Sequence, residues 1–133
     1  MKNNCKIQPL TSEDLPAIEQ IQPDGWPDIL PSITFYCSSE FCFPIKATIN
    51  EALVGIGTAI IFGDTAWVGH IIVHKDYRNN GIGTLVTQSL INLINETSCR
   101  TILLIATPLG EPVYKKFGFE VQSQYLFLND GNL

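Results

Sequence analysis

The sequence predicts one α/β domain, built on a mixed and partly antiparallel sheet that is flanked by helices. Three strand-like runs follow one another between residues 45 and 74 and are joined by short turns, which is typical of an antiparallel meander. Residues 66–74 and 101–106 are apolar runs separated by an amphipathic helix, and such a connection requires two parallel strands. The chain has 133 residues, of which 45% are hydrophobic, so it is long enough for one core and too short for two domains. We therefore expect residues 1–133 to form a single domain.

The first 44 residues predict a short strand, a helix and a long irregular connection. The strand covers Lys6 to Gln8. Hydroxyl and acidic side chains at residues 11–14 favour a helix start, and apolar residues recur at helical spacing until Pro23 ends the helix. Pro16 is tolerated because it lies close to the helix start. Residues 23–44 contain four prolines and five aromatic residues with no sustained period, so we expect loops and a short helix there.

Regular patterns begin again at Ile45. Residues 45–49, 53–62 and 65–74 predict strands. A helix follows from about residue 83 to residues 96–98, because leucines and isoleucines form an apolar stripe along it. Residues 101–106 form a continuous apolar run, as in a strand that is buried on both faces. A short helix at residues 110–117 is closed by Gly118, and residues 121–128 predict a last strand.

Composition and charge exclude several classes of protein. The formal net charge is −5 with only eight Lys and Arg residues, which argues against a nucleic-acid partner. No apolar run reaches the roughly twenty residues of a membrane span, and no apolar core follows the first residues as in a signal peptide. We therefore expect a cytoplasmic protein with no membrane partner. The four cysteines match neither a zinc pattern nor a redox pair, so we expect free thiols and no metal, with a Cys37–Cys42 link as the alternative.

The junction from His70 to Thr84 is the most informative stretch for function. An apolar strand runs into a basic turn with two glycines, Gly81 and Gly83, that opens directly into a helix. The first N–H groups of a helix have no intrahelical acceptor and lie at the positive end of its dipole, so they can bind phosphate. The glycine spacing matches neither a P-loop nor a dinucleotide-binding fingerprint, and a tight turn without a ligand is the alternative. The residues expected at the phosphates are Arg78, Asn79, Asn80, Gly81, Ile82, Gly83 and Thr84.

Two motifs give this stretch a more specific meaning. Residues 73–83 read Val-His-Lys-Asp-Tyr-Arg-Asn-Asn-Gly-Ile-Gly, which fits the pattern R/Q-x-x-G-x-G/A after a central strand. Residues 114–120 read Tyr-Lys-Lys-Phe-Gly-Phe-Glu, in which a tyrosine precedes a Gly-Phe pair, with a predicted helix and strand between the motifs. On these two motifs, residues 45–128 resemble the GNAT superfamily of acyl-CoA-dependent N-acetyltransferases, whereas residues 1–44 match it only in outline.

The resemblance implies a cosubstrate, acetyl-CoA, and a way to bind it. In GNAT folds the two parallel central strands splay apart, and the pantetheine arm inserts between them like an extra strand. Residues 66–119 would then form the cofactor-binding core, with the pyrophosphate at the helix start. The backbone groups expected along the arm are those of Ile71, Ile72 and Val73.

The acceptor implied by the resemblance is a primary amine of a small molecule or peptide that attacks the thioester directly. Residues 23–44 are expected on the acceptor side, with Trp26 as one wall of the pocket. Packing beneath a long connection is the alternative for the aromatic residues of this segment. The acidic net charge mildly favours a cationic acceptor such as an amine. We expect a monomer or a homodimer.

Two side chains are candidates for proton transfer. Tyr114 is expected to act as the acid for the departing thiolate, because a phenol with a pKa of about 10 is reasonably matched to a thiol of about 8.5. A tyrosine that packs at a sheet end is the alternative. Many relatives carry a glutamate base on the central strand, but residues 66–74 contain no carboxylate, which makes His70 the candidate base. Strand alternation could equally turn His70 toward the packed face, and a water chain could take its place.

Two other interpretations stay open. A non-catalytic acyl-CoA-binding or sensor module would keep the phosphate turn without turnover; the missing carboxylate favours it, whereas Tyr114 favours the enzyme. The chain could also be one domain of a longer protein, or take a strand from a partner subunit, because it stops without the extra terminal strand that many relatives have.

Overall fold

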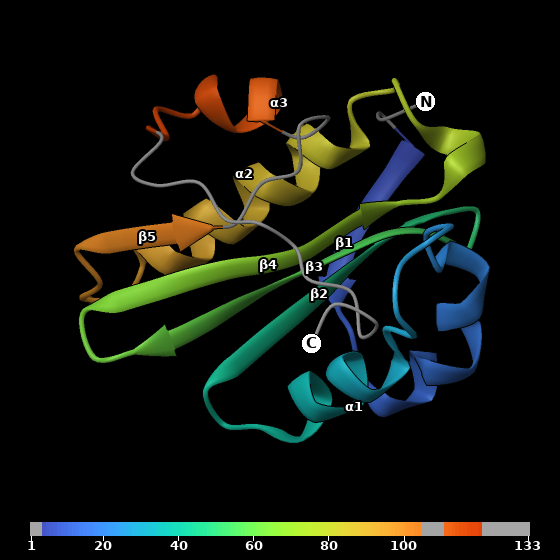
Figure 1. Cartoon of the computed structure of the whole chain (residues 1–133), viewed down its shortest axis with the longest axis horizontal. Helices are drawn as coiled ribbons and strands as arrows, with labels where there is room; N and C mark the ends of the chain where they lie inside the picture. The colour runs from blue at the N-terminus through green and yellow to red at the C-terminus, as the bar shows by residue number, and fades with distance from the viewer. Residues whose placement is uncertain (1–3, 105–110, 121–133) are drawn as a thin grey trace, which may run out of the picture.

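The computed structural model shown in Figure 1 describes residues 4–104 and 111–120. Its strands form one five-stranded sheet in the order β1-β2-β3-β4-β5. Strands β1 to β4 are antiparallel neighbours, whereas β4 and β5 run parallel. The mixed, partly antiparallel sheet expected from the sequence is therefore confirmed. The strands are β1 (Cys5–Pro9), β2 (Cys42–Ile49), β3 (Ala52–Phe62), β4 (Thr65–Val73) and β5 (Thr101–Leu104).

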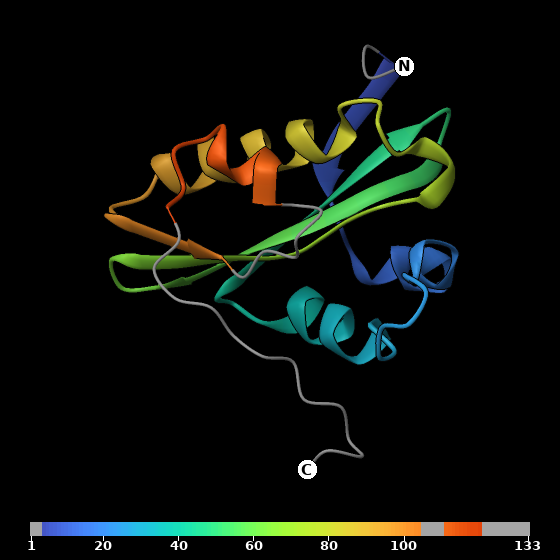
Figure 2. The same cartoon turned by 45° about the horizontal axis from the view of Figure 1, so that its top comes forward.

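Helices cover both faces of the sheet (Figure 2). Helix α2 lies across one face, where Val86, Leu90 and Ile94 are fully buried against the strands. On the opposite face, η2 and α1 contribute Ile18 and Ile33 to a second core. Helix α2 also makes the parallel crossover from β4 to β5 that the sequence predicts. The helices are η2 (Ser12–Ile21), α1 (Leu30–Ser38), η3 (Lys75–Tyr77), α2 (Ile82–Asn95) and α3 (Glu111–Lys115), of which η2 and η3 are 3-10 helices.

The N-terminal segment shows why its elements were harder to predict than the rest. The expected helix at residues 12–21 is present, but as a 3-10 helix, and Pro16 inside it has no N–H to donate. Helix α1 is the short helix expected within residues 23–44; it begins at Leu30 and has Pro31 in its first turn, where the missing N–H has no cost. Strand β2 starts at Cys42, three residues earlier than predicted, because its pairing with β3 continues that far.

The meander is connected as expected. Asn50 and Glu51 both have positive φ, as a two-residue type I′ hairpin loop requires, and Gly63 has a positive φ in the second turn. All four cysteines are free thiols. Among the described residues, no helix is both long and apolar enough to span a membrane. Part of the predicted strand at 101–106 and the whole predicted strand at 121–128 lie outside the described residues.

Candidate active site

Strand β4 carries a bulge near its C-terminal end. The register of β4 against β3 shifts between Ile56 and Thr58, so that two residues of β4, His70 and Ile71, face the single residue Gly57. His70 has a φ of +49°, in the left-handed region that histidine tolerates better than most residues. The bulge therefore fixes where the His70 side chain lies.

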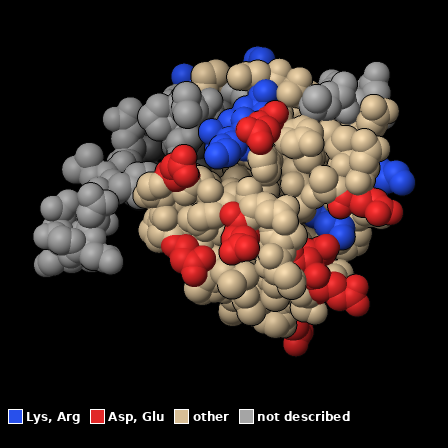
Figure 3. All heavy atoms as spheres, turned by 90° about the vertical axis from the view of Figure 1, so that its right-hand side faces the viewer, with Lys and Arg blue, Asp and Glu red and all other residues tan. Residues whose placement is uncertain are grey.

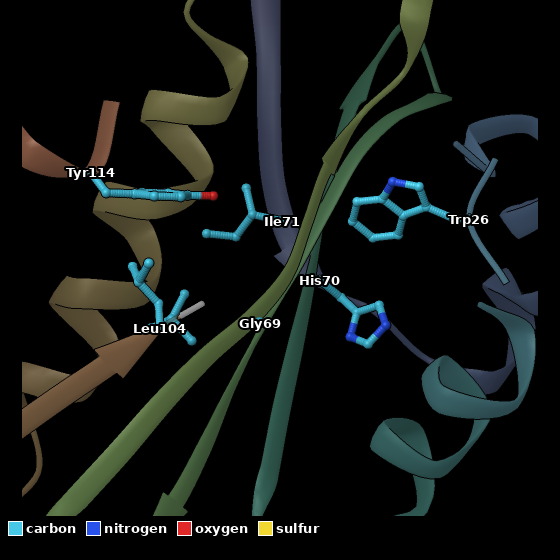
Figure 4. Close-up of a pocket in the computed structure, with 7 residues that line it drawn as sticks. Trp26, Gly69, His70, Ile71, Leu104 and Tyr114 are labelled. Carbon is cyan, nitrogen blue, oxygen red and sulfur yellow. The ribbon is translucent and has the colours of Figure 1, made fainter. Parts of the chain in front are cut away.

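The bulge resets the alternation of side chains along β4. Val68 and Ile71, three residues apart, both pack on the α2 side of the sheet, whereas Ile72 is buried in the core on the opposite side. A regular strand would turn His70 to the same side as Val68. Figure 4 instead shows the His70 ring across β4 from Ile71, on the side that carries Trp26.

A small cavity of about 80 Å³ lies beside the bulge. Along the described residues, pairing of β4 with β5 ends at Val68 and Leu104, directly before the bulge. In Figure 4 the Tyr114 ring extends from α3 with its hydroxyl toward β4. The cavity thus brings together four residues that the sequence singled out: Trp26, the neighbours His70 and Ile71, and Tyr114. Its lining residues are Trp26, Val68, Gly69, His70, Ile71, Leu104 and Tyr114.

The end of helix α3 holds Tyr114 in place. The Gly118 N–H donates to the Lys115 carbonyl at 3.0 Å and the Phe119 N–H donates to the Tyr114 carbonyl at 3.4 Å, with a φ of +90° at Gly118. This is a Schellman ending, and its usual apolar contact is the edge-on packing of Phe119 on the Tyr114 ring, with centroids 6.4 Å apart. Burial raises the pKa of Tyr114, so the phenol stays protonated near neutral pH. The Gly-Phe pair after Tyr114 therefore has a structural reason.

His70 contacts a residue that the sequence did not mark as functional. The His70 Nδ1 atom lies 2.9 Å from the hydroxyl of Tyr36 on α1, and the two rings meet edge to face with centroids 5.3 Å apart. Burial lowers the pKa of His70, which keeps the ring neutral near pH 7. No local pattern could reveal this contact, because its partners are 34 residues apart.

The glycine-bearing turn is held by its own polar groups. The Asp76 N–H donates to the His74 ring at 3.1 Å, and the Arg78 Nε donates to the Val73 carbonyl at 3.2 Å. The Asn80 side chain donates to two carbonyls of the turn, so among the expected phosphate residues it acts as a local brace. Gly81 is the N-cap of α2 with a φ of +81°. These contacts fix the path by which the chain enters α2.

The start of α2 is open to an anion. No side-chain hydrogen bond caps it, and the first intrahelical bond runs from the Leu85 N–H to the Gly81 carbonyl at 3.0 Å. The N–H groups of Ile82, Gly83 and Thr84 precede that bond and are the ones a helix start leaves for a ligand. Figure 3 shows a cluster of Lys and Arg side chains in the upper part of one face, with acidic side chains beside it and mostly acidic side chains across the lower part. Lys75 and Arg78 bring positive charge to the turn that precedes this helix start, in a protein whose formal net charge is −5.

Trp26 is positioned by Gln22, another residue that the sequence did not mark. The Gln22 side-chain amide donates to the carbonyls of Trp26 at 3.2 Å and Pro27 at 3.0 Å, and its oxygen accepts the Ile29 N–H at 3.0 Å. One side chain thus closes the loop between η2 and α1. Trp26 remains 42% exposed, so the indole is accessible as a wall of the cavity. Among the described residues, no group of three His, Cys, Asp or Glu side chains is placed to hold a metal ion.

Comparison with known proteins shows which protein family the sequence matches. The model of the acetyltransferase (GNAT) family matches residues 8–119, which includes most of the N-terminal segment that the motifs alone matched only in outline. The chain is 32% identical over 92 residues to the uncharacterised protein YyaT of Bacillus subtilis (strain 168), covering 69% of this chain and 62% of YyaT. The aligned part is therefore less than two thirds of that relative.

Solved structures share the fold. The ribosomal-protein-S18-alanine N-acetyltransferase from Escherichia coli has a TM-score of 0.80 at 21% identity, covering 90% of this chain and 79% of that one. A predicted acetyltransferase from Clostridium acetobutylicum, solved with acetyl-CoA, has a TM-score of 0.71 at 23% identity, covering 94% of this chain and 96% of that one. At these identities the likeness shows the fold alone. The family match over most of the chain, however, shows that the chain belongs to the GNAT acetyltransferase family.

Proposed function

We propose that this protein is an N-acetyltransferase that moves the acetyl group of acetyl-CoA to a primary amine of a small molecule or peptide by direct attack. The observation that carries the proposal is the cavity beside the β4 bulge, because Tyr114 and His70 line it from opposite sides of the strand. A direct transfer needs an acid and a base at two places around one reacting carbon. This pair can supply them.

The described residues fit acetyl-CoA. The uncapped start of α2 offers the N–H groups of Ile82, Gly83 and Thr84 to a pyrophosphate, and Arg78 lies in the turn that leads into this helix start. Residues 71–73 of β4 join this turn to the cavity, and their backbone can pair with an amide-bearing arm as an edge strand pairs with a peptide. When bound there, the cosubstrate supplies the acetyl thioester.

The chain's own groups would move two protons. The amine nitrogen bonds to the thioester carbon, its carbon–sulfur bond breaks, and the departing thiolate takes the hydroxyl proton of Tyr114. The proton lost by the amine goes to His70 or through water to solvent, and solvent later restores the Tyr114 proton. A backbone N–H of β4 can stabilise the negative charge that develops on the carbonyl oxygen.

The test is thiol release from acetyl-CoA with a panel of polyamines, amino acids, aminoglycosides and peptide amines. Release above the hydrolysis background with at least one amine is the expected result. Tyr114→Phe should then lower kcat by about 10²-fold or more with little change in the Kd for acetyl-CoA. Tyr77→Phe is the matched control, since it removes a phenol that lies outside the cavity lining and keeps the ring contact with His74. An unchanged kcat in Tyr114→Phe would remove this residue from the mechanism.

A non-catalytic acyl-CoA sensor is the second candidate. Strand β4 carries no carboxylate, which favours a protein that binds without turnover. Calorimetry separates the two functions: saturable CoA binding with no thiol release from any amine in the panel would support the sensor, and release would exclude it.

A further inference from the structure

The contact between Tyr36 and His70 decides which nitrogen of the imidazole can take a proton. The Tyr36 hydroxyl occupies Nδ1 at 2.9 Å, so proton exchange with a bound amine falls to Nε2. Either Nδ1 carries the hydrogen and donates to the tyrosine oxygen, or the tyrosine donates to Nδ1. Only the first arrangement leaves Nε2 basic, because a neutral imidazole has one donor and one acceptor nitrogen.

Protonation of the ring distinguishes the two arrangements. In the imidazolium both nitrogens carry hydrogens, so Nδ1 must donate to the Tyr36 oxygen. The first arrangement keeps its hydrogen bond when Nε2 takes a proton, whereas the second must rotate the tyrosine hydroxyl and lose the bond it had. A general base passes between the neutral and the protonated ring in every catalytic cycle, so the arrangement that keeps its hydrogen bond in both protonation states suits it better.

We propose that Tyr36 is a positioning residue, which accepts the Nδ1 hydrogen of His70 and thereby presents Nε2 as the basic atom. The role of Nε2 toward the acceptor rests on the proposed function, whereas the hydrogen-bond direction does not. In the transfer, the amine proton passes to Nε2 while the Nδ1 hydrogen stays on Nδ1 and remains donated to the Tyr36 oxygen, and the imidazolium then returns one proton to solvent. No other reactant is needed.

The backbone and the surroundings support this assignment. His70 has a positive φ, a conformation that persists where the surrounding structure determines it, and here the bulge and the Tyr36 contact both do so. Among the described residues, the titratable group in contact with His70 is Tyr36 from α1; Tyr114 from α3 lines the same cavity from the other side of β4, and Cys42 lies near enough to Tyr36 to influence it. Burial, then the charge of Cys42, raises the pKa of Tyr36, so the phenol is neutral and its oxygen is a competent acceptor.

The experiment is an NMR titration of His70 in the wild type and in Tyr36→Phe. The chain has two histidines, so assignment is direct, and His74 serves as an internal reference because it contacts Asp76 and Tyr77 instead. If Tyr36 accepts the Nδ1 hydrogen, its removal destabilises the imidazolium and lowers the pKa of His70 by about one unit. Nitrogen chemical shifts of the wild type should show the neutral ring protonated at Nδ1.

Opposite results overturn the proposal. A raised or unchanged pKa of His70 in Tyr36→Phe, or a neutral ring protonated at Nε2, would show that the tyrosine donates. Phe35→Leu is the matched control on the same helix, since it removes an exposed ring that packs on Tyr36 but keeps the Tyr36 hydroxyl. It should leave the pKa of His70 unchanged. If amine-dependent thiol release is found, the acidic limb of kcat/KM should move with the His70 pKa. The titration is read without any substrate, so a failed transferase assay does not affect it.

Discussion

The two glycines at the start of α2 should respond in opposite ways to the same substitution. Gly81 is the N-cap and has a φ of +81°, where a Cβ is strained whatever space surrounds it. Gly83 lies inside the first turn of the helix, and a Cβ added there would meet the Val73 side chain at 3.6 Å, an ordinary contact. Gly81→Ala and Gly83→Ala are therefore a matched pair that differs in backbone conformation.

The magnitudes follow from that difference. Alanine in the left-handed region costs about 1–2 kcal/mol, so Gly81→Ala should lower the free energy of unfolding by that amount. Alanine in a helix is favoured over glycine by up to about 1 kcal/mol, so Gly83→Ala should raise it. Urea unfolding, followed by the fluorescence of the two tryptophans, should separate the variants by about 1–3 kcal/mol.

The same pair tests the phosphate site when unfolding is repeated with CoA. At a CoA concentration 100-fold above its Kd, wild type should gain about 2.7 kcal/mol, and Gly83→Ala should keep this gain because its turn is unchanged. Gly81→Ala should lose most of it, since the N–H groups of the first helical turn would no longer converge. A folded Gly81→Ala protein that keeps the full CoA-dependent gain would refute the assignment of this turn to the diphosphate. A Gly81→Ala protein whose free energy of unfolding without CoA equals that of the wild type would refute the claim that the positive φ of Gly81 strains an alanine.

Three further substitutions test how the site is supported. Gln22→Ala removes the amide that braces the loop before α1, and we expect about a tenfold rise in the acceptor KM with an unchanged Kd for CoA. Gly57→Ala would place a Cβ 2.7 Å from a methyl group of Val86, and we expect unfolding to become easier by about 1–3 kcal/mol in thermal melts. Burial tends to raise the pKa of Asp14, but the hydrogen bonds it accepts, led by that from Lys46 at 2.6 Å, lower it overall. The Asp14–Lys46 pair should therefore stabilise the protein at pH values above the ordinary carboxyl pKa, and this stabilisation should be lost as the pH falls through the lowered pKa of Asp14. Lys46→Met should accordingly lower the free energy of unfolding by less than about 1 kcal/mol at pH 7 and leave it unchanged in strong acid.

Most of the fold was predictable because its signals are local. The meander, the crossover helix and the glycine-bearing turn each depend on neighbours within a few residues, and the structure confirms all three. Helix α1 was expected only as a short helix somewhere in residues 23–44, because its sequence has no regular apolar period. Its place is set by tertiary packing, through Ile33 in the core beneath the sheet.

The candidate site was predictable only in part for the same reason. Tyr114 and the helix start were marked by motifs, whereas Gln22 and Tyr36 act through contacts with distant or irregular segments. The side of the sheet on which His70 lies could not be predicted from the two-residue alternation of a regular strand. One extra residue in β4 reverses the side of every residue after it. The side of the sheet that His70 occupies therefore depends on the register of β4 against β3.

The bulge is also what separates the two candidate proton-transfer groups. In a regular strand His70 would share the α2 side with Val68, and Tyr114 would approach the cavity from that same side. Gly57, opposite the bulge, has no side chain, which lets Val86 and Ile71 occupy the α2 side while the imidazole lies on the other. In the proposed reaction one proton leaves the entering nitrogen while another is needed at the departing sulfur. In that proposed reaction, the bulge in β4 would place the base on one side of the strand and the acid on the other.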